Sequence, residues 1–209
     1  MRSESGQDGQ KMRSFIEQAR RAQIIGAAIE TIAEHGYANA SLARIAKHAD
    51  ISKGVISYHF AGKEELIEQV VTQVFSAIVE EVAPRVTAAP GPREALREHI
   101  IAVGEYVLAH RTQLMALSEI INGARSTEGK PLYGISSSED LYESLELYFA
   151  SGQDSGVFRH FDRRVMAVTL QSAIDGAFGY WVVHPEHDLA AHMTELADHI
   201  DRAVLADPA

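Results

Sequence analysis

Hydroxyl, basic and aromatic-hydroxyl side chains are concentrated between residues 37 and 63 of this 209-residue chain. Side chains of these types donate hydrogen bonds to phosphate oxygens and to the edges of bases. Ser52 and Lys53 stand where a helix is expected to begin, and the free N–H groups and dipole of a helix favour an anion at that end. The polar residues of this kind are Ser41, Arg44, Ser52, Lys53, Ser57, Tyr58, His59 and Lys63.

Two short helices joined by a tight turn are predicted to position these side chains. Ser41 can N-cap a helix over residues 42–48, and Ser52 can N-cap a second helix over residues 53–60. Apolar residues are spaced to form one small shared core: Leu42, Ile45, Ala46, Ile51, Val55 and Ile56. This is the plan of a helix-turn-helix, whose second helix enters the major groove of DNA. A helical hairpin inside a larger core, with its polar residues exposed by default, gives the same local pattern.

The longer string around this hairpin resembles the TetR/AcrR family of bacterial transcriptional regulators. Four groups match the usual order of that family, which the chain resembles over roughly residues 15–70: Ser52-Lys53-Gly54, Val55-Ile56, Tyr58-His59-Phe60 and Lys63-Glu64-Glu65-Leu66. The resemblance implies an N-terminal three-helix DNA-binding head, linked by a long helix to a C-terminal helical domain. It also implies that Tyr58, His59 and Lys63 contact the DNA backbone, and that Lys53, Val55 and Ser57 contact bases or their flanks.

Three positions depart from the usual string of the family. Asp50 stands in the turn where Gly is usual, and an Asp tolerates left-handed backbone there at some cost. Val55 replaces a common Thr, and Ser57 replaces a common aromatic residue. A valine can touch a thymine methyl group but cannot donate a hydrogen bond. The operator is therefore expected to differ from those of better-known relatives.

Charge and composition agree with a DNA-binding head on an acidic body. The net charge of −10 is divided unevenly, because residues 1–63 carry +3 and residues 64–209 carry −13. This asymmetry concentrates attraction for phosphate at one end. The chain has no cysteine, which excludes disulfides and cysteine-based zinc sites. No apolar run is long enough to span a bilayer and the start is not signal-like, so we expect a cytoplasmic protein without a membrane partner.

The whole chain is expected to be all-α, since no strand-like alternation of useful length occurs. We predict a flexible arm over residues 1–13, a DNA-binding domain over residues 14–63, and a ligand-binding and dimerisation domain over residues 64–209. A helix from residue 62 to about residue 82 is expected to end at Pro84. Further helices are expected at about 14–35, 93–110, 112–123, 138–151, 162–183 and 188–205.

The last two predicted helices are candidates for pairing with a second copy of the chain. The final one carries an apolar stripe of Leu189, Met193, Leu196, Ile200 and Val204. This stripe suits a partner chain, and it suits the chain's own core equally well. A homodimer would place two recognition helices one DNA turn apart, about 34–36 Å, on a palindromic operator.

The resemblance also implies a small-molecule pocket in the C-terminal domain. Aromatic residues with a few carboxylates can hold a lipophilic cation, so the expected effector is mainly apolar, with a cationic aromatic compound as one option. The candidate residues are Tyr106, Met115, Glu119, Asn122, Tyr133, Tyr142, Tyr148, Phe149, Gln171, Asp175, Phe178 and Trp181. The competing interpretation is that these aromatic residues form ordinary core and the carboxylates are solvated.

Three functions are compatible with these features to different degrees. The preferred hypothesis is a ligand-responsive repressor, released from its operator by an effector. The alternative is an effector-independent DNA-binding protein, and an enzyme on a helical scaffold is less favoured because no Gly-rich phosphate loop, Gly-x-Ser-x-Gly or His-Glu-x-x-His motif occurs. One helical face carrying Asp188, His192, Glu195 and His199 can hold a metal ion or form a solvated rim. We expect no metal and no cofactor.

Overall fold

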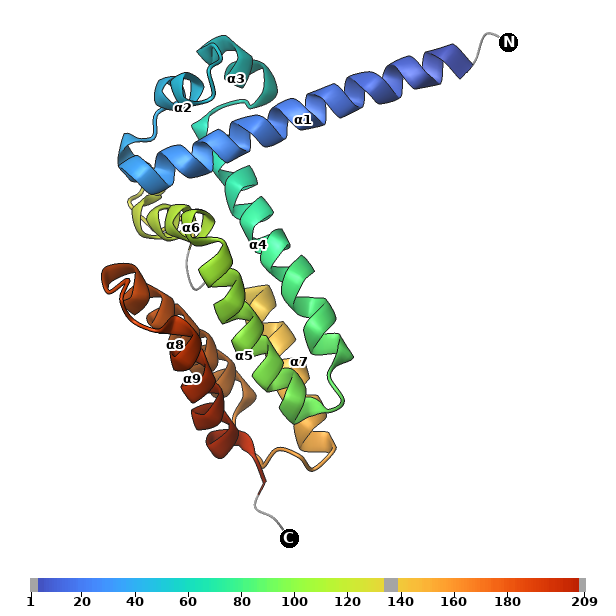
Figure 1. The fold of residues 1–209 in the computed structure, drawn as a ribbon, viewed down its shortest axis with the longest axis vertical. Helices are drawn as coiled ribbons and strands as arrows, with labels where there is room; N and C mark the ends of the chain where they lie inside the picture. Colours follow the sequence, from blue (N-terminus) through green and yellow to red (C-terminus); the bar gives the residue numbers. More distant parts are fainter. Residues whose placement is uncertain (1–3, 134–138, 207–209) are drawn as a thin grey trace. The chain divides into compact units, whose positions relative to one another are not determined.

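Helices account for the regular structure of the part of the chain that the computed structural model describes, residues 4–133 and 139–206 (Figure 1). Side chains are described from Phe15 onward. The elements are α1 (Glu4–His35), the 3₁₀ turn η1 (Tyr37–Asn39), α2 (Leu42–His48), α3 (Lys53–His59), α4 (Lys63–Ala88), α5 (Pro92–Ala109), α6 (Arg111–Gly123), α7 (Glu139–Asp154), α8 (Arg163–Val183) and α9 (Leu189–Val204). The all-α prediction is confirmed. Within these ranges, no helix is both long and apolar enough to cross a membrane.

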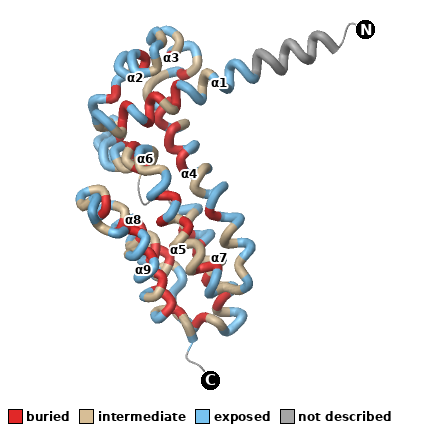
Figure 2. Tube along the Cα trace, viewed as in Figure 1, coloured by how far each residue is buried: buried red, intermediate tan, exposed pale blue. Residues whose placement is uncertain are grey.

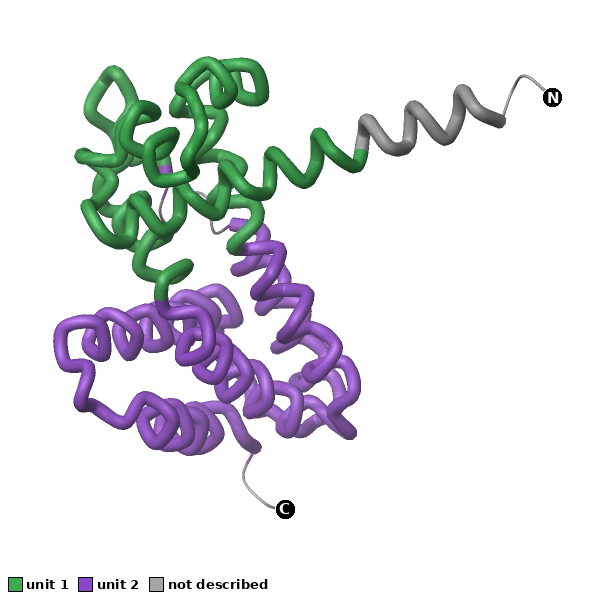
Figure 3. Tube along the Cα trace, turned by 45° about the horizontal axis from the view of Figure 1, so that its top comes forward, with its two compact units in different colours: residues 1–74, 112–132 green, residues 75–111, 133–209 purple. Residues whose placement is uncertain are grey.

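The chain divides into two compact units, which Figure 3 distinguishes by colour. The head unit comprises Met1–Val74 and Thr112–Leu132, and the body unit comprises Phe75–Arg111 and Tyr133–Ala209. These units do not follow the predicted domain limit at residue 64. The first turns of α4 belong with the head because Leu66, Ile67 and Val70 are buried. Almost all of α6 also belongs to the head unit.

The core of the head unit is formed by the buried residues of α1, α2, α3, the start of α4 and α6 (Figure 2). In α1 the spacing of Ile25, Ile29 and Ile32 places these side chains on one stripe, and all three are buried. Ile45 of α2 and Ile56 of α3 are fully buried as well. Because α1 extends back to Glu4, it begins earlier than the predicted start near residue 14.

The prediction that a helix ends near Pro84 was wrong, because α4 continues through this residue to Ala88. A proline inside a helix removes one backbone N–H donor. Here Pro84 is exposed, and the next residue fixes the following turn. Arg85 lies 2.5 Å from a carboxylate oxygen of Glu98 and 2.5 Å from one of Glu105, both on α5.

The core of the body unit is built around α5 and α9. Gly104 allows the close approach of these helices, since a Cβ there would lie 2.5 Å from Cγ of Met193. The apolar stripe of α9 faces this core, where four of its members are buried: Leu189, Met193, Ile200 and Val204. These four side chains therefore pack in the chain's own core, which is one of the two interpretations that the sequence left open.

Candidate nucleic-acid interface

The helix-turn-helix of the head unit begins with two serine caps, as its sequence predicts. Oγ of Ser41 accepts a hydrogen bond from the backbone N–H of Arg44 at 3.2 Å. Oγ of Ser52 accepts one from the N–H of Val55 at 3.3 Å. Each serine thereby satisfies a free N–H group at the start of its helix.

The turn between α2 and α3 uses left-handed backbone at Asp50, whose φ is 53°. This is the left-handed conformation that the sequence predicts for Asp50. The next residue closes the turn, because the N–H of Ile51 donates to the carbonyl of Ala46 at 2.9 Å. The direction of α3 is therefore fixed by backbone contacts close to the turn.

One face of α3 is open to solvent. Lys53, Gly54, Ser57 and Tyr58 are exposed, and Tyr58 retains 82% of its accessible surface. No hydrogen bond or ion pair to another described residue holds the side chains of Lys53 and Ser57. Val55 is half-buried and Arg44 of α2 is exposed; the guanidinium of Arg44 donates to the carbonyl of Asn39 at 3.1 Å. The exposed face offers a cation, two hydroxyls and an apolar edge.

Helix α1 supports this hairpin from behind, a role that sequence reasoning missed. Arg21 donates to the backbone carbonyl of His59, which is the last residue of α3, and its guanidinium lies 4.3 Å from the centre of the Phe60 ring. Nε2 of Gln23 donates to the carbonyl of Ala49, at the end of α2, at 3.2 Å. α1 thus satisfies carbonyls at the C-terminal ends of both short helices.

Glu65 completes this support at the start of α4. Its carboxylate accepts the N–H of Ala61 at 2.6 Å and lies 3.4 Å from the guanidinium of Arg21. The backbone hydrogen bond from Ala61 and the nearby Arg21 hold the pKa of Glu65 below its ordinary value. The third position of a helix is where an acidic capping residue is expected, so Glu65 could have been found from its place in Lys63-Glu64-Glu65. Arg21 lies 38 residues from its carbonyl partner and carries no such local signal.

Two of the residues predicted to contact DNA, Lys63 and His59, are less exposed to solvent than most of the other candidates. Lys63 is half-buried, and its Nζ donates to the carbonyl of Tyr37 at 2.9 Å. His59 is also half-buried, and its Nδ1 is buried without a hydrogen-bond partner among the described atoms. The exposed contact candidates are therefore Ser41, Arg44, Ser52, Lys53, Ser57 and Tyr58.

The predicted effector residues fall in both units. Met115, Glu119 and Asn122 belong to the head unit, and Glu119 accepts the backbone N–H of Tyr37 at 3.3 Å. The other candidates belong to the body unit: Tyr106, Tyr133, Tyr142, Tyr148, Phe149, Gln171, Asp175, Phe178 and Trp181.

Several of the body-unit candidates have buried side chains. Tyr106, Tyr142, Phe149 and Trp181 are buried. Phe149 packs edge-on against Phe161, with ring centres 5.5 Å apart. Gln171 donates to Asp175 at 2.8 Å along the same helix. The burial and the contacts of these residues are also what the competing interpretation, a packed core, predicts.

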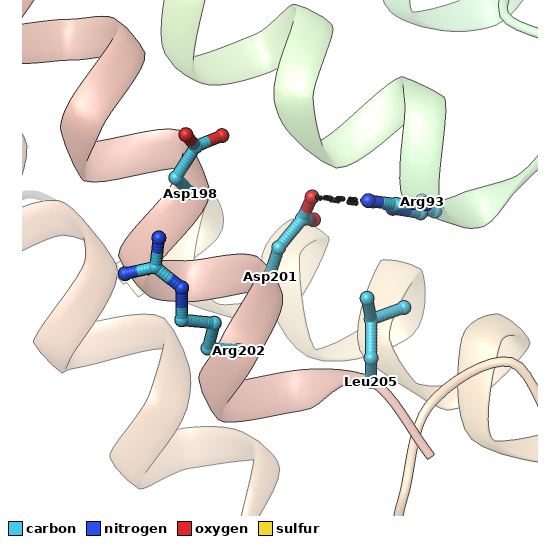
Figure 4. A pocket seen from close by; sticks show the side chains of 5 residues that line it. All are labelled: Arg93, Asp198, Asp201, Arg202 and Leu205. Atoms are coloured by element: carbon cyan, nitrogen blue, oxygen red, sulfur yellow. Dashed lines mark hydrogen bonds and ion pairs between the residues drawn. The ribbon is translucent and has the colours of Figure 1, made fainter. Parts of the chain in front are cut away.

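Two surface hollows in the body unit are lined by other residues. One of about 370 Å³ lies beside Glu143, Glu146, Leu147, Arg163 and Arg164. The other, of about 220 Å³, is lined by Arg93, Asp198, Asp201, Arg202 and Leu205 (Figure 4). Neither contains a predicted effector residue.

The hollow of Figure 4 is bordered by ion pairs between α5 and α9. Arg93 lies 3.2 Å from a carboxylate oxygen of Asp201, the contact marked in Figure 4. Arg97, also on α5, lies 2.6 Å from Asp198 and 2.9 Å from Asp201. The hydrogen bond from Arg97 holds the pKa of Asp198 below its ordinary value. These contacts join α5 to α9, the two helices that share the core around Met193.

The histidines near the end of the chain do not assemble into a metal site. Nε2 of His187 lies 2.9 Å from Nδ1 of His192, and Nδ1 of His199 contacts the backbone carbonyl of Glu195 at 2.7 Å. Within the described ranges, no group of three or more His, Asp or Glu side chains is arranged to hold a metal ion. Asp188 serves instead as the N-cap of α9, accepting the N–H of Ala191 at 2.9 Å.

Comparison with known proteins matches the segment that carries this hairpin. Residues 24–70 match the family described as bacterial regulatory proteins, tetR family. The chain is 45% identical over 84 residues to the HTH-type transcriptional regulator BetI 1 of Chromohalobacter salexigens, a match that covers 40% of each protein. The chain thus spans about two fifths of the length of this curated relative.

Solved structures match nearly the whole chain at low sequence identity. FadR from Bacillus subtilis, solved in complex with stearoyl-CoA, has a TM-score of 0.74 at 22% identity, covering 85% of this chain and 95% of FadR. A complex of SmeT with triclosan has a TM-score of 0.72 at 20% identity, covering 90% of this chain and 93% of SmeT. At these identities the likeness concerns the fold alone.

Proposed function

We propose that this chain is a ligand-responsive transcriptional repressor of the tetR family that acts as a cytoplasmic homodimer, because residues 24–70 match that family and BetI 1 is 45% identical to the chain over 84 residues. The observation that carries the proposal is the exposed face of α3. Lys53, Ser57 and Tyr58 point to solvent there, while Ser52 and Arg21 hold the two ends of the helix. The family and its relatives are regulators, so the chain is not an enzyme.

We propose that α3 enters the major groove of a palindromic operator. Lys53 at its N-terminus can donate to a phosphate or to the edge of a guanine, and Ser57 and Tyr58 can donate from their hydroxyls. Val55 is suited to a thymine methyl group. Ser41 and Arg44 of α2 lie exposed beside the same hairpin and are proposed as backbone contacts.

The outer face of α8 supports pairing of two copies. Val165, Tyr180 and Val183 of this helix retain 62%, 51% and 72% of their accessible surface. A Cβ added at Gly176 or Gly179 would meet nothing within 4 Å. Exposed apolar side chains between small residues suit the close packing of helices from two chains. With the stripe of α9 used internally, α8 becomes the proposed centre of the dimer contact.

We propose that the effector is a small, mainly apolar organic compound. Two proteins of similar fold are described as complexes with organic compounds that have a large apolar part: triclosan for SmeT, and stearoyl-CoA, whose acyl chain is apolar, for FadR. Glu119 accepts a backbone N–H in the head unit, which removes one carboxylate from the set proposed for a cation. Release from DNA requires that the effector binds the DNA-incompetent shape more tightly than the competent one.

A binding selection tests this function. Purified protein is mixed with a pool of duplexes that contain a randomised 30-base-pair segment, and bound DNA is enriched and sequenced. We expect palindromic sites with half-site centres about 34–36 Å apart. Failure to enrich any sequence contradicts the proposed DNA binding.

A gel shift on the enriched duplex then tests release. It is repeated with a panel of cationic, neutral and anionic aromatic compounds. Release by at least one member supports an effector-controlled repressor. Binding that no member weakens, together with no heat of binding for any compound in calorimetry, favours the effector-independent alternative.

A further inference from the structure

The 3₁₀ turn η1, which leads from α1 into the helix-turn-helix, is held from two sides. On one side Nζ of Lys63 donates to the carbonyl of Tyr37 at 2.9 Å and lies 4.3 Å from the centre of the Tyr37 ring. On the other side the carboxylate of Glu119 accepts the N–H of Tyr37 at 3.3 Å. One residue thus has its N–H, its carbonyl and its ring engaged by two side chains from distant parts of the sequence.

Tyr37 and Lys63 lie on opposite sides of the helix-turn-helix in the sequence, so their contact affects that whole segment. Tyr37 precedes the helix-turn-helix and Lys63 follows it as the first residue of α4. The bond between them therefore ties together the entry and the exit of the segment that contains α2 and α3. Glu119 lies on α6, so a third helix holds the same turn.

Two glycines let α6 approach the turn closely. Gly36 has a φ of 78°, and a Cβ there would lie 3.1 Å from Oε2 of Glu119. At Gly123, also on α6, a Cβ would lie 3.0 Å from Cδ1 of the Tyr37 ring. A larger residue at Gly36 would displace the Glu119 carboxylate, and one at Gly123 would press against the Tyr37 ring.

The ammonium group of Lys63 is engaged by groups of the protein itself. Burial lowers the pKa of Lys63, and burial together with nearby Glu64 raises the pKa of Tyr37. A partly desolvated ammonium that already has a carbonyl and an aromatic face as partners would lose both in order to reach a phosphate. Lys53 differs on each count, because it is exposed at the N-terminus of α3 and has no described partner.

We propose that Lys63, Tyr37 and Glu119 form a clip that positions the recognition helix, with Lys63 acting through Tyr37 and not on a DNA phosphate. This inference rests on the proposed DNA-binding function. It departs from the role that family resemblance gives Lys63, and it takes Glu119 out of the effector pocket. Both residues become positioning residues of the head unit.

Salt dependence distinguishes a clip from a phosphate contact. Each phosphate contact contributes about 0.9 to the slope of log K against log[salt], because its loss leaves a counterion on the DNA. Binding of the wild-type protein to its selected duplex is measured by fluorescence anisotropy between 50 and 300 mM KCl. The variants are Lys63→Gln and, as a matched exposed control, Lys53→Gln.

We expect Lys63→Gln to weaken binding about tenfold with an unchanged slope, while binding to a scrambled duplex stays the same. Lys53→Gln is expected to lower the slope by about one unit. A slope that falls by about one unit in Lys63→Gln, as in the control, overturns the proposal. Failure of the wild-type protein to bind any duplex is a separate result that contradicts the proposed function itself.

Substitution of Glu119 gives a second test, because the clip and a simple charge effect predict opposite changes in DNA affinity. Removing an acidic side chain near DNA should tighten binding if only net charge matters. The clip requires the reverse, so Glu119→Ala should weaken specific binding about fivefold, whereas Glu119→Gln keeps an acceptor oxygen for the Tyr37 N–H and should bind within about twofold of wild type. Tighter or equal binding by Glu119→Ala contradicts the clip, even if Lys63→Gln fails to fold.

Discussion

The head unit and the body unit differ in how closely their functional side chains follow local sequence. In the head, the residues expected to face DNA stand on a seven-residue helix, α3, and four of that helix's residues are exposed. In the body, four of the aromatic residues expected to line a pocket are buried: Tyr106, Tyr142, Phe149 and Trp181. A helix face is set by the spacing of neighbouring residues, whereas a pocket depends on how distant helices meet. A DNA-contacting face on one seven-residue helix is therefore easier to predict from the sequence than a pocket formed by helices from across the body unit.

The two units also use arginine differently. Arg21 of the head donates to the backbone carbonyl of His59 and lies over the Phe60 ring, so it caps the C-terminal end of α3. Arg85 and Arg97 of the body each contact two carboxylates, so they join helices. Some of the acidic side chains of the body are therefore neutralised by arginines of the same unit.

The largest effect on stability is expected in the body, at Gly152. A Cβ there would lie 1.9 Å from the ring of Phe158, which is buried and packed beside Phe149. The ring has no room to move, so Gly152→Ala should lower the free energy of unfolding by about 3 kcal/mol. The matched control is Gly26→Ala in the head, where a Cβ meets nothing within 4 Å and the change should stabilise the helix by about 0.5–1 kcal/mol. Urea unfolding at one fixed protein concentration measures both, and similar losses in the two variants would contradict the packing described.

The body is also expected to be the acid-sensitive unit. Burial lowers the pKa of His99 on α5 to about 4, so the folded protein keeps this imidazole neutral while the unfolded chain takes up a proton below its ordinary pKa of 6.5. Stability is therefore full above about pH 6.5 and falls as the pH drops toward 4, by at most about 3 kcal/mol.

His99→Leu tests this assignment by removing the titrating group. Urea unfolding at pH 7, 6, 5 and 4 should show a flatter dependence for the variant than for wild type. If both proteins lose the same stability over this range, the acid sensitivity belongs to another group.

A smaller loss is expected at the support of the recognition helix. Arg21→Ala removes the hydrogen bond to the His59 carbonyl and the contact with Phe60, which should cost about 2 kcal/mol. Gln18→Ala is the control, because Gln18 is exposed on the same helix without a hydrogen bond or ion pair to a described residue, and its loss should change stability by less than about 0.5 kcal/mol. Thermal unfolding compares the two, and equal melting temperatures would show that α1 does not support α3.

The smallest effect is expected at the N-cap of α3. Ser52→Ala removes the acceptor for the N–H of Val55 and should cost about 1 kcal/mol. Ser57→Ala, in the same helix but without a described side-chain partner, should change stability by less than about 0.5 kcal/mol. A Ser52→Ala variant as stable as Ser57→Ala, judged by urea unfolding, would deny the capping role.

Prediction from sequence succeeded where one helix or one turn carries the information. Ser41, Ser52 and Asp50 act as expected because caps and left-handed turns depend on residues one to three positions away. The helix limits in the body also agree to within a few residues, since Asp162 and Asp188 mark the starts of α8 and α9.

Prediction failed where a distant partner decides the outcome. The stripe of α9 reads equally as core or interface, and only its packing near Gly104 of α5 settles the choice. α4 continues through Pro84, and Arg85 in the turn that follows pairs with two carboxylates of α5, which are distant in sequence. Glu119 resembles a pocket carboxylate in sequence, yet its partner Tyr37 lies 82 residues away.

The central claim, that the outer face of α3 holds DNA, is tested most directly by moving one negative charge. Ser57 of α3 and Ser151 of α7 are both exposed helical serines without a described side-chain partner, one in each unit. Fluorescence anisotropy on the selected duplex compares Ser57→Glu and Ser151→Glu with wild type at equal salt. We expect Ser57→Glu to weaken binding at least tenfold, about 1.4 kcal/mol, and Ser151→Glu to stay within about twofold. Equal affinities for the two variants would contradict the claim.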